Sequence, residues 1–180
     1  MRNILAIAGR ELSGLFGQPV AAISLSLFLG LLAVFALWFD DVLRGGIASM
    51  RGPFFWIAAC FLFLIPAVTM RLLAEESKLG TIELLLTSPV RDWEVIIGKY
   101  VASLVFFLVL VGLSFFYAIL LFVYADPDPG PIYAGYLGFI LYGAAALAVG
   151  LLTSTMTNNQ IVSAVVAMGI LLALFFADRA

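Results

Sequence analysis

The stretch YVASLVFFLVLVGLSFFYAILLFVYA, residues 100–125, decides the fold because it contains no charged side chain along its whole length. An α-helix rises about 1.5 Å per residue, so about 20 apolar residues cross the roughly 30 Å hydrocarbon core of a bilayer. The stretch is longer than that minimum. It therefore predicts a membrane-spanning helix.

Four further runs have the same character, and the sequence of 180 residues is 64% hydrophobic and only 11% charged. That composition is far from the one usual for a soluble domain. It predicts an all-α fold, a polytopic transmembrane helical bundle that forms a single domain over residues 1–180. The five expected spans, none of which contains Asp, Glu, Lys or Arg, are residues 20–39, 53–70, 100–125, 132–152 and 161–177.

Small residues gather in the fourth expected span. Some are four positions apart, a spacing that lets neighbouring helices approach closely. We expect them to pack within one subunit rather than to form a dimer seam. They are Gly135, Gly138, Gly143, Ala146 and Gly150.

The N-terminal segment, residues 1–18, predicts an amphipathic helix. At about 100° per residue its apolar side chains share one arc and its polar side chains occupy the rest, which is typical of a helix lying in the membrane interface. Packing on a soluble core is the alternative. The apolar members are Ile4, Leu5, Ala8, Leu12, Leu15 and Phe16, and the polar members are Arg2, Asn3, Arg10, Glu11 and Ser13.

Composition excludes several classes of function. The net charge of −2 provides no basic surface for nucleic acid, and with no His and the single Cys60 no metal site is expected. No phosphate-binding G-x-x-x-x-G-K-[ST] motif and no G-x-S-x-G motif occurs, so we expect neither a catalytic nor a cofactor site, and no ATP hydrolysis by this chain. The uncharged spans disfavour an ion-coupled carrier, whereas a channel remains an alternative.

Basic residues indicate the orientation in the cell (inner) membrane, because Lys and Arg are enriched on the cytoplasmic side. The connection at residues 126–131 has no basic residue, although Arg44 and Arg51 in the first outer loop weaken the rule. We expect the N-terminus and residues 71–99 to be cytoplasmic. The basic residues in these two regions are Arg2, Arg10, Arg71, Lys78, Arg91 and Lys99.

Residues 71–99 predict a helical stalk followed by a short cytoplasmic helix. Good helix formers continue the second span until Gly80, Thr81 can cap a new helix, and Pro89 ends it. Asp92 is a candidate cap for the helix that re-enters the bilayer. A two-turn helix is unstable alone in water, so it needs either the membrane interface or a groove on a soluble partner.

The run EESKLGTIELLLTSPVRDWEVIIGK, residues 75–99, resembles the cytoplasmic segment of type-2 ATP-binding-cassette (ABC) transporter permeases. The closest resemblance is to the branch with the gliding-motility-associated and nitrous-oxide-reductase-maturation permeases, and residues 1–18 resemble that family's elbow helix. The matching elements are Glu75 with Glu76, Gly80 with Thr81, Glu83, Leu84 with Leu85, the Ser88–Pro89–Val90 triplet, and Gly98 with Lys99.

The resemblance implies a permease subunit of an ATP-driven exporter, working with a separate ABC ATPase subunit and a second permease copy, identical or different. It also implies six spans, so the chain is expected to lack one at its C-terminal end. A membrane scaffold that recruits another cytoplasmic protein is the alternative function. The residues implied to couple the permease to the ATPase are Glu75, Glu76, Leu79, Gly80, Thr81, Ile82, Glu83, Leu84, Leu85, Leu86, Ser88, Pro89 and Val90.

Overall fold

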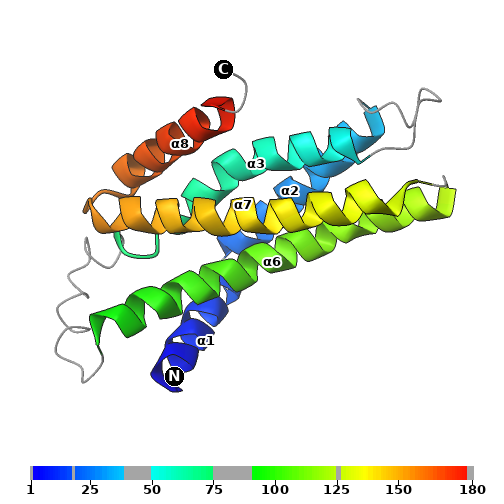
Figure 1. Ribbon diagram of the computed structural model, residues 1–180. Coiled ribbons are helices and arrows are strands. Elements are labelled where there is room, and N and C mark those ends of the chain that lie inside the picture. Colours follow the sequence, from blue (N-terminus) through cyan, green and yellow to red (C-terminus); the bar gives the residue numbers. More distant parts are fainter. Residues whose placement is uncertain (1, 18, 39–49, 75–90, 125–126, 178–180) are drawn as a thin grey trace.

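The computed structural model describes residues 2–17, 19–38, 50–74, 91–124 and 127–177. These residues form six α-helices and no strand, which confirms the all-α fold class (Figure 1). The helices are α1 (Arg2–Gly17), α2 (Pro19–Trp38), α3 (Arg51–Thr69), α6 (Asp92–Tyr124), α7 (Pro129–Thr155) and α8 (Gln160–Ala177).

Among the described residues, α3, α6, α7 and α8 are long and apolar enough to cross a membrane. Helix α2 coincides with the first expected span, and its residues Leu25–Val34 form a shorter apolar stretch. The chain is thus built as a bundle of apolar helices, as the uncharged runs predicted.

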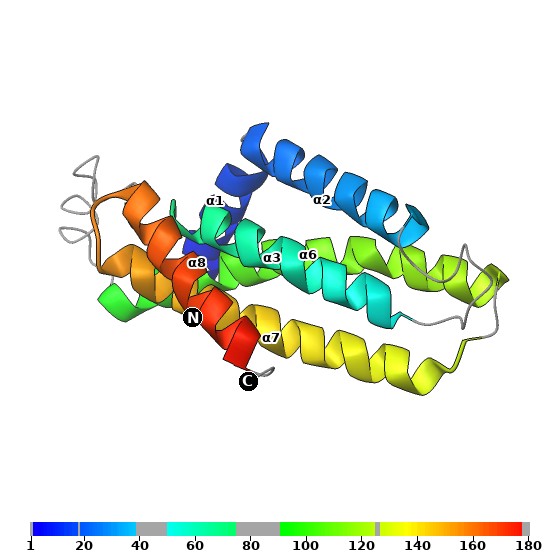
Figure 2. The same cartoon turned by 90° about the horizontal axis from the view of Figure 1, so that it is seen from above.

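Helices α6 and α7 run in opposite directions and pack against each other (Figure 1). Helix α3 packs between α2 and α7, α8 crosses the outer side of α3 and α7, and α1 crosses the first part of α6 (Figure 2). At the start of α7 the Asp128 carboxylate accepts a hydrogen bond from the Gly130 N–H at 3.1 Å, with Pro129 at the first helical position. Asp128 therefore caps α7, which is a local reason for the sharp turn into that helix.

Phe61 of α3 is the centre of the core. It is fully buried, and its ring is surrounded by rings from three other helices. Aromatic pairs at such separations contribute about 0.5–1.5 kcal/mol each beyond the burial of their area. Four helices therefore meet at one aromatic cluster. The distances from the Phe61 ring centroid are 5.0 Å to Phe28 of α2, 4.8 Å to Phe107 of α6 and 5.1 Å to Phe139 of α7.

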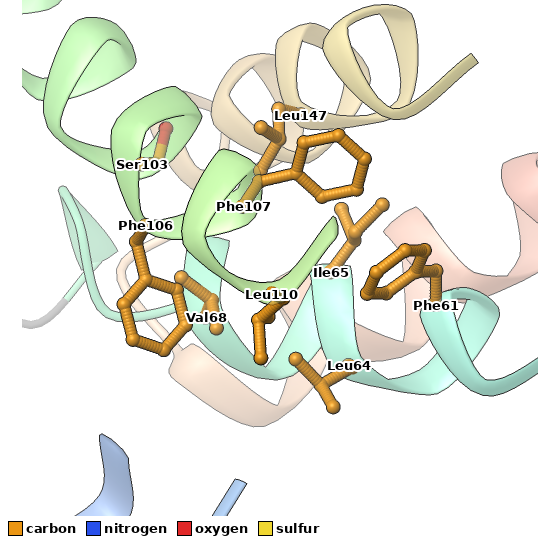
Figure 3. A pocket seen from close by; sticks show the side chains of 9 residues that line it. All are labelled: Phe61, Leu64, Ile65, Val68, Ser103, Phe106, Phe107, Leu110 and Leu147. Carbon is orange, nitrogen blue, oxygen red and sulfur yellow. The ribbon is translucent and has the colours of Figure 1, made fainter. Parts of the chain in front are cut away.

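A small apolar cavity of about 10 Å³ lies beside this cluster, between α3, α6 and α7 (Figure 3). A cavity of that size holds about one water molecule at most. Its lining is apolar except for Ser103, whose hydroxyl donates to the carbonyl of Tyr100 in its own helix. This cavity is too small to receive a transported molecule.

Glycines of α7 allow its close approach to α3 and α6. A Cβ added at Gly143 would overlap the ring of Phe107, and one at Gly135 would overlap the ring of Phe54. At Gly150 an added Cβ would overlap Thr69, whereas at Gly138 it would meet open space. The expected close packing of the small residues is confirmed at three of these glycines, and Gly138 is not part of it.

Candidate functional site

Every predicted coupling residue, from Glu75 to Val90, lies outside the described residues. The structure does describe both flanks of that segment, residues 70–74 before it and 91–99 after it. Both flanks lie at the end of the bundle where α7 ends and α8 begins, on the left in Figure 1. The candidate site is therefore built from the helices that hold these two flanks.

The first flank interrupts the predicted helical stalk at residues 70–73, and Ala74 is helical again, so the continuous helix expected from residue 71 is wrong there. Helix α3 ends at Thr69, and residues 70–73 form turns instead of continuing the helix. Helix α7 holds these turns, because the Ser154 hydroxyl accepts hydrogen bonds from the backbone N–H groups of Leu73 at 3.2 Å and Ala74 at 3.1 Å. In a continuing helix these N–H groups would bond to carbonyls four residues earlier. Helix propensity alone did not reveal this competition from Ser154.

Replacing Ser154 by alanine is expected to loosen residues 70–74. Ser154 is 2% exposed and Ala74 is fully buried, and the change removes the acceptor of two backbone N–H groups, which costs about 1–3 kcal/mol because buried donors lose their partner. Hydrogen exchange of the Leu73 and Ala74 amides should therefore become faster. Thr155→Val is the matched control, because Thr155 is exposed and its hydroxyl bonds to Leu152 of its own helix. Equal exchange in both variants would contradict the assignment.

The second flank opens α6 with a charged cap. The Glu94 carboxylate accepts a hydrogen bond from the backbone N–H of Arg91 at 3.2 Å and another from the Asn3 side-chain amide of α1 at 3.3 Å. This is the return half of a capping box, in which an acid at the third helical position satisfies the N–H of the cap residue. The expected cap, Asp92, is instead the first residue of the helix. Glu94 thus fixes the helix start and bonds it to α1.

Helix α1 packs on the first part of α6 where the two helices cross. A Cβ added at Gly98 would lie 2.7 Å from Cγ2 and 2.9 Å from Cβ of Ile7, so the two helices are in close contact there. One residue further on, the Lys99 ammonium is 2.8 Å from the Glu11 carboxylate. Asn3, Ile7 and Glu11 are four residues apart and share one face of α1. Two side chains from the polar arc of the expected interfacial helix, Asn3 and Glu11, therefore contact α6.

Residues 45–177 match the sequence profile described as ABC-2 family transporter protein, and this match decides the family. This range contains α3, α6, α7 and α8 together with both flanks. The chain belongs to the ABC-2 transporter family. Its membership and its four apolar helices identify a multi-pass membrane protein.

Two curated relatives of this ABC-2 family chain come from Escherichia coli, strains K12 and O157:H7. Each is named probable multidrug ABC transporter permease YbhR and is 31% identical over 93 residues, which are 52% of the chain and 25% of the relative. The chain spans about a quarter of the length of these relatives. The predicted resemblance is confirmed at the level of the family, and the narrower gliding-motility and nitrous-oxide branch stays a prediction.

Proposed function

We propose that this chain is the membrane permease subunit of an ATP-driven transporter and that a separate ABC ATPase subunit docks on residues 75–90. Membership of the ABC-2 family supports this function, as does the name of the YbhR relatives. The docking element takes its apolar contacts from Ile82, Leu85 and Leu86 and a polar contact from Glu83. ATP is bound and hydrolysed on the partner.

The observation that carries the proposal is the attachment of both flanks of residues 75–90 to the helical bundle. The first flank is bonded to α7 through Ser154, and the second is bonded to α1 through Glu94 and Lys99. A segment held at both ends transmits a displacement to the helices that hold it, whereas a segment on free loops does not. This arrangement supports a role for residues 75–90 in passing movement from a docked subunit to the membrane helices.

The proposal includes an orientation and an assembly. Docking of an ATPase that uses cytoplasmic ATP requires the N-terminus and residues 71–99 to face the cytoplasm, with α1 in the interface of the inner membrane. Two permease copies would each hold one ATPase subunit. Export is the direction that the family resemblance implies. The narrower branch with the gliding-motility permeases belongs to the same proposal.

Leu85→Asp and Glu83→Arg are expected to abolish stable association with the cognate ATPase subunit. A charge at Leu85 would be buried without a partner in an apolar groove, and a basic side chain at Glu83 would reverse the polar contact. Association is measured by co-purification from native membranes and by affinity in lipid nanodiscs, with a loss of about 100-fold, equivalent to about 3 kcal/mol, as the expected effect.

Leu85→Met is the matched control because it keeps the apolar volume, and its association should stay near that of the unchanged chain. If both charged variants bind the ATPase normally and keep ATP-dependent conformational changes, residues 75–90 are not the docking element. If the chain instead recruits a different cytoplasmic protein through these residues and no ATPase, the scaffold function replaces the transporter function.

A further inference from the structure

An ion pair is buried where α1 crosses α6. The Lys99 side chain is 2% exposed and its ammonium lies 2.8 Å from a Glu11 carboxylate oxygen, while the Glu11 side chain is 24% exposed. The partners are 88 residues apart in the sequence. A lysine at the end of an apolar helical run ordinarily extends its ammonium into water. Lys99, which directly precedes the run of residues 100–125, lies under α1 instead.

Burial of Lys99 decides whether the ion pair contributes mainly to stability or to the geometry of the junction. Surface ion pairs contribute little to stability, and a buried pair is often no more stabilising than apolar residues of the same volume. Its strong effect is on geometry, because removing the Glu11 carboxylate leaves the Lys99 ammonium in a place that water hardly reaches, whereas the Glu11 side chain is 24% exposed. The pair therefore fixes the position of α1 on α6 more than it adds to the stability of the bundle.

Neighbouring contacts restrict the same junction. Gly98 brings the α6 backbone close to Ile7 and to the carbonyl of Ile4, at 3.3 Å from an added Cβ. Asn3 bonds to Glu94 one helical turn before that contact. Farther along, the rings of Phe16 and Phe106 meet edge to face at 5.3 Å. The ion pair is thus the charged member of a row of contacts along one face of α1.

We propose that Glu11 and Lys99 are positioning residues that make α1 and the beginning of α6 a single rigid unit. Movement of residues 75–90 would then reach α1 through α6, while the other flank passes movement to α7 through Ser154. The source of that movement rests on the proposed function. The rigid junction itself does not, because it exists without any partner.

The junction is tested first with the full chain alone in lipid nanodiscs. Spin labels are placed at the exposed positions Ser13 on α1 and Phe116 on α6, in a Cys60→Ser background, and their distance distribution is measured by pulsed electron paramagnetic resonance. Glu11→Gln and Lys99→Met are each expected to broaden the distribution. If both variants keep the narrow distribution of the unchanged pair, the proposal is wrong.

Matched variants separate positioning from a general loss of folding. Lys99→Arg keeps the buried charge and Arg10→Gln removes an exposed charge from the same helix, so both should keep the narrow distribution. Lys99→Met is the milder of the two disruptive changes, because the partly exposed Glu11 can be hydrated after the lysine is lost. It therefore gives a decision even if Glu11→Gln does not fold.

The second measurement adds the cognate ATPase with ATP and vanadate. The distance from residue 13 to residue 116 should stay constant, while the distance from residue 13 to Leu141 of α7 should change. Glu11→Gln should leave ATPase association intact and uncouple α1 from α6. If Leu85→Asp loses its association with the ATPase, the docking proposal stands. If the distances in the unchanged chain then do not change with nucleotide, only the transfer of movement through the rigid unit is contradicted. Normal association in Leu85→Asp would contradict the docking proposal alone, leaving the junction result to stand.

Discussion

Gly143→Ala is expected to destabilise the helical bundle by about 3 kcal/mol or more, at the upper end of the cost of overpacking a core. The added Cβ would overlap the ring of Phe107 at its far edge. That ring is 2% exposed and packs against the rings of Phe61 and Phe139, so it cannot rotate away without breaking the aromatic cluster. The alternative is a separation of α6 from α7, which opens the centre of the protein.

The stability of Gly143→Ala is measured as unfolding by sodium dodecyl sulfate in mixed micelles. Gly138→Ala is the matched control on the same helix, because its added Cβ meets open space and should be neutral or stabilising by up to about 1 kcal/mol. Phe107→Leu removes the ring atoms that collide with the new methyl group, so Gly143→Ala with Phe107→Leu should be more stable than Gly143→Ala alone. If Phe107→Leu restores no stability to Gly143→Ala, the destabilisation does not come from a clash with the Phe107 ring.

Much of the fold could be predicted because membrane helices follow from local composition. Residues 100–125 have no charge, and this alone requires a helix that satisfies its own backbone hydrogen bonds in hydrocarbon. The bounds were less certain, since α6 begins at Asp92 and α7 extends from Pro129 to Thr155, beyond the expected residues 132–152. The extra residues of α7, at 129–131 and 153–155, are Pro, Gly, Thr and Ser and carry little hydropathy signal, whereas the first turns of α6 mix charged with apolar residues.

The contacts around the candidate site could not be predicted in the same way. Ser154 accepts a hydrogen bond from the backbone N–H of Ala74, 80 residues away in the sequence, and Glu11 and Lys99 are separated by 88 residues. A hydropathy pattern reports which side chains avoid water, and it does not report which distant polar groups meet. The match of Gly98 and Lys99 to the permease family was the available signal. Their contacts with Ile7 and Glu11 depend on how α1 packs on α6, which no local pattern encodes.

Gly98→Ala is expected to weaken the contact between α1 and α6 by about 1–3 kcal/mol, the usual cost of overpacking. The new methyl group would lie 2.7 Å from Cγ2 of Ile7. It would also be 2.9 Å from the Ile7 Cβ, an atom fixed to the backbone of α1, so a rotation of the side chain cannot relieve the clash. The whole helix α1 has to move, which also lengthens the Glu11–Lys99 contact.

The expected effect of Gly98→Ala is local and is therefore measured by hydrogen exchange. Amides of residues 2–17 should exchange faster, whereas those of α7 and α8 should not change, because the main neighbours of α1 are α6 and α2. Gly112→Ala, also on α6 but with nothing near its added Cβ, should leave α1 protected. Ile7→Ala removes the Cγ2 atom that is closest to the new methyl group, so the pair Gly98→Ala with Ile7→Ala should regain part of the lost protection. Faster exchange that spreads over the whole bundle would instead mean that Gly98 supports the fold in general and not specifically the packing of α1 on α6.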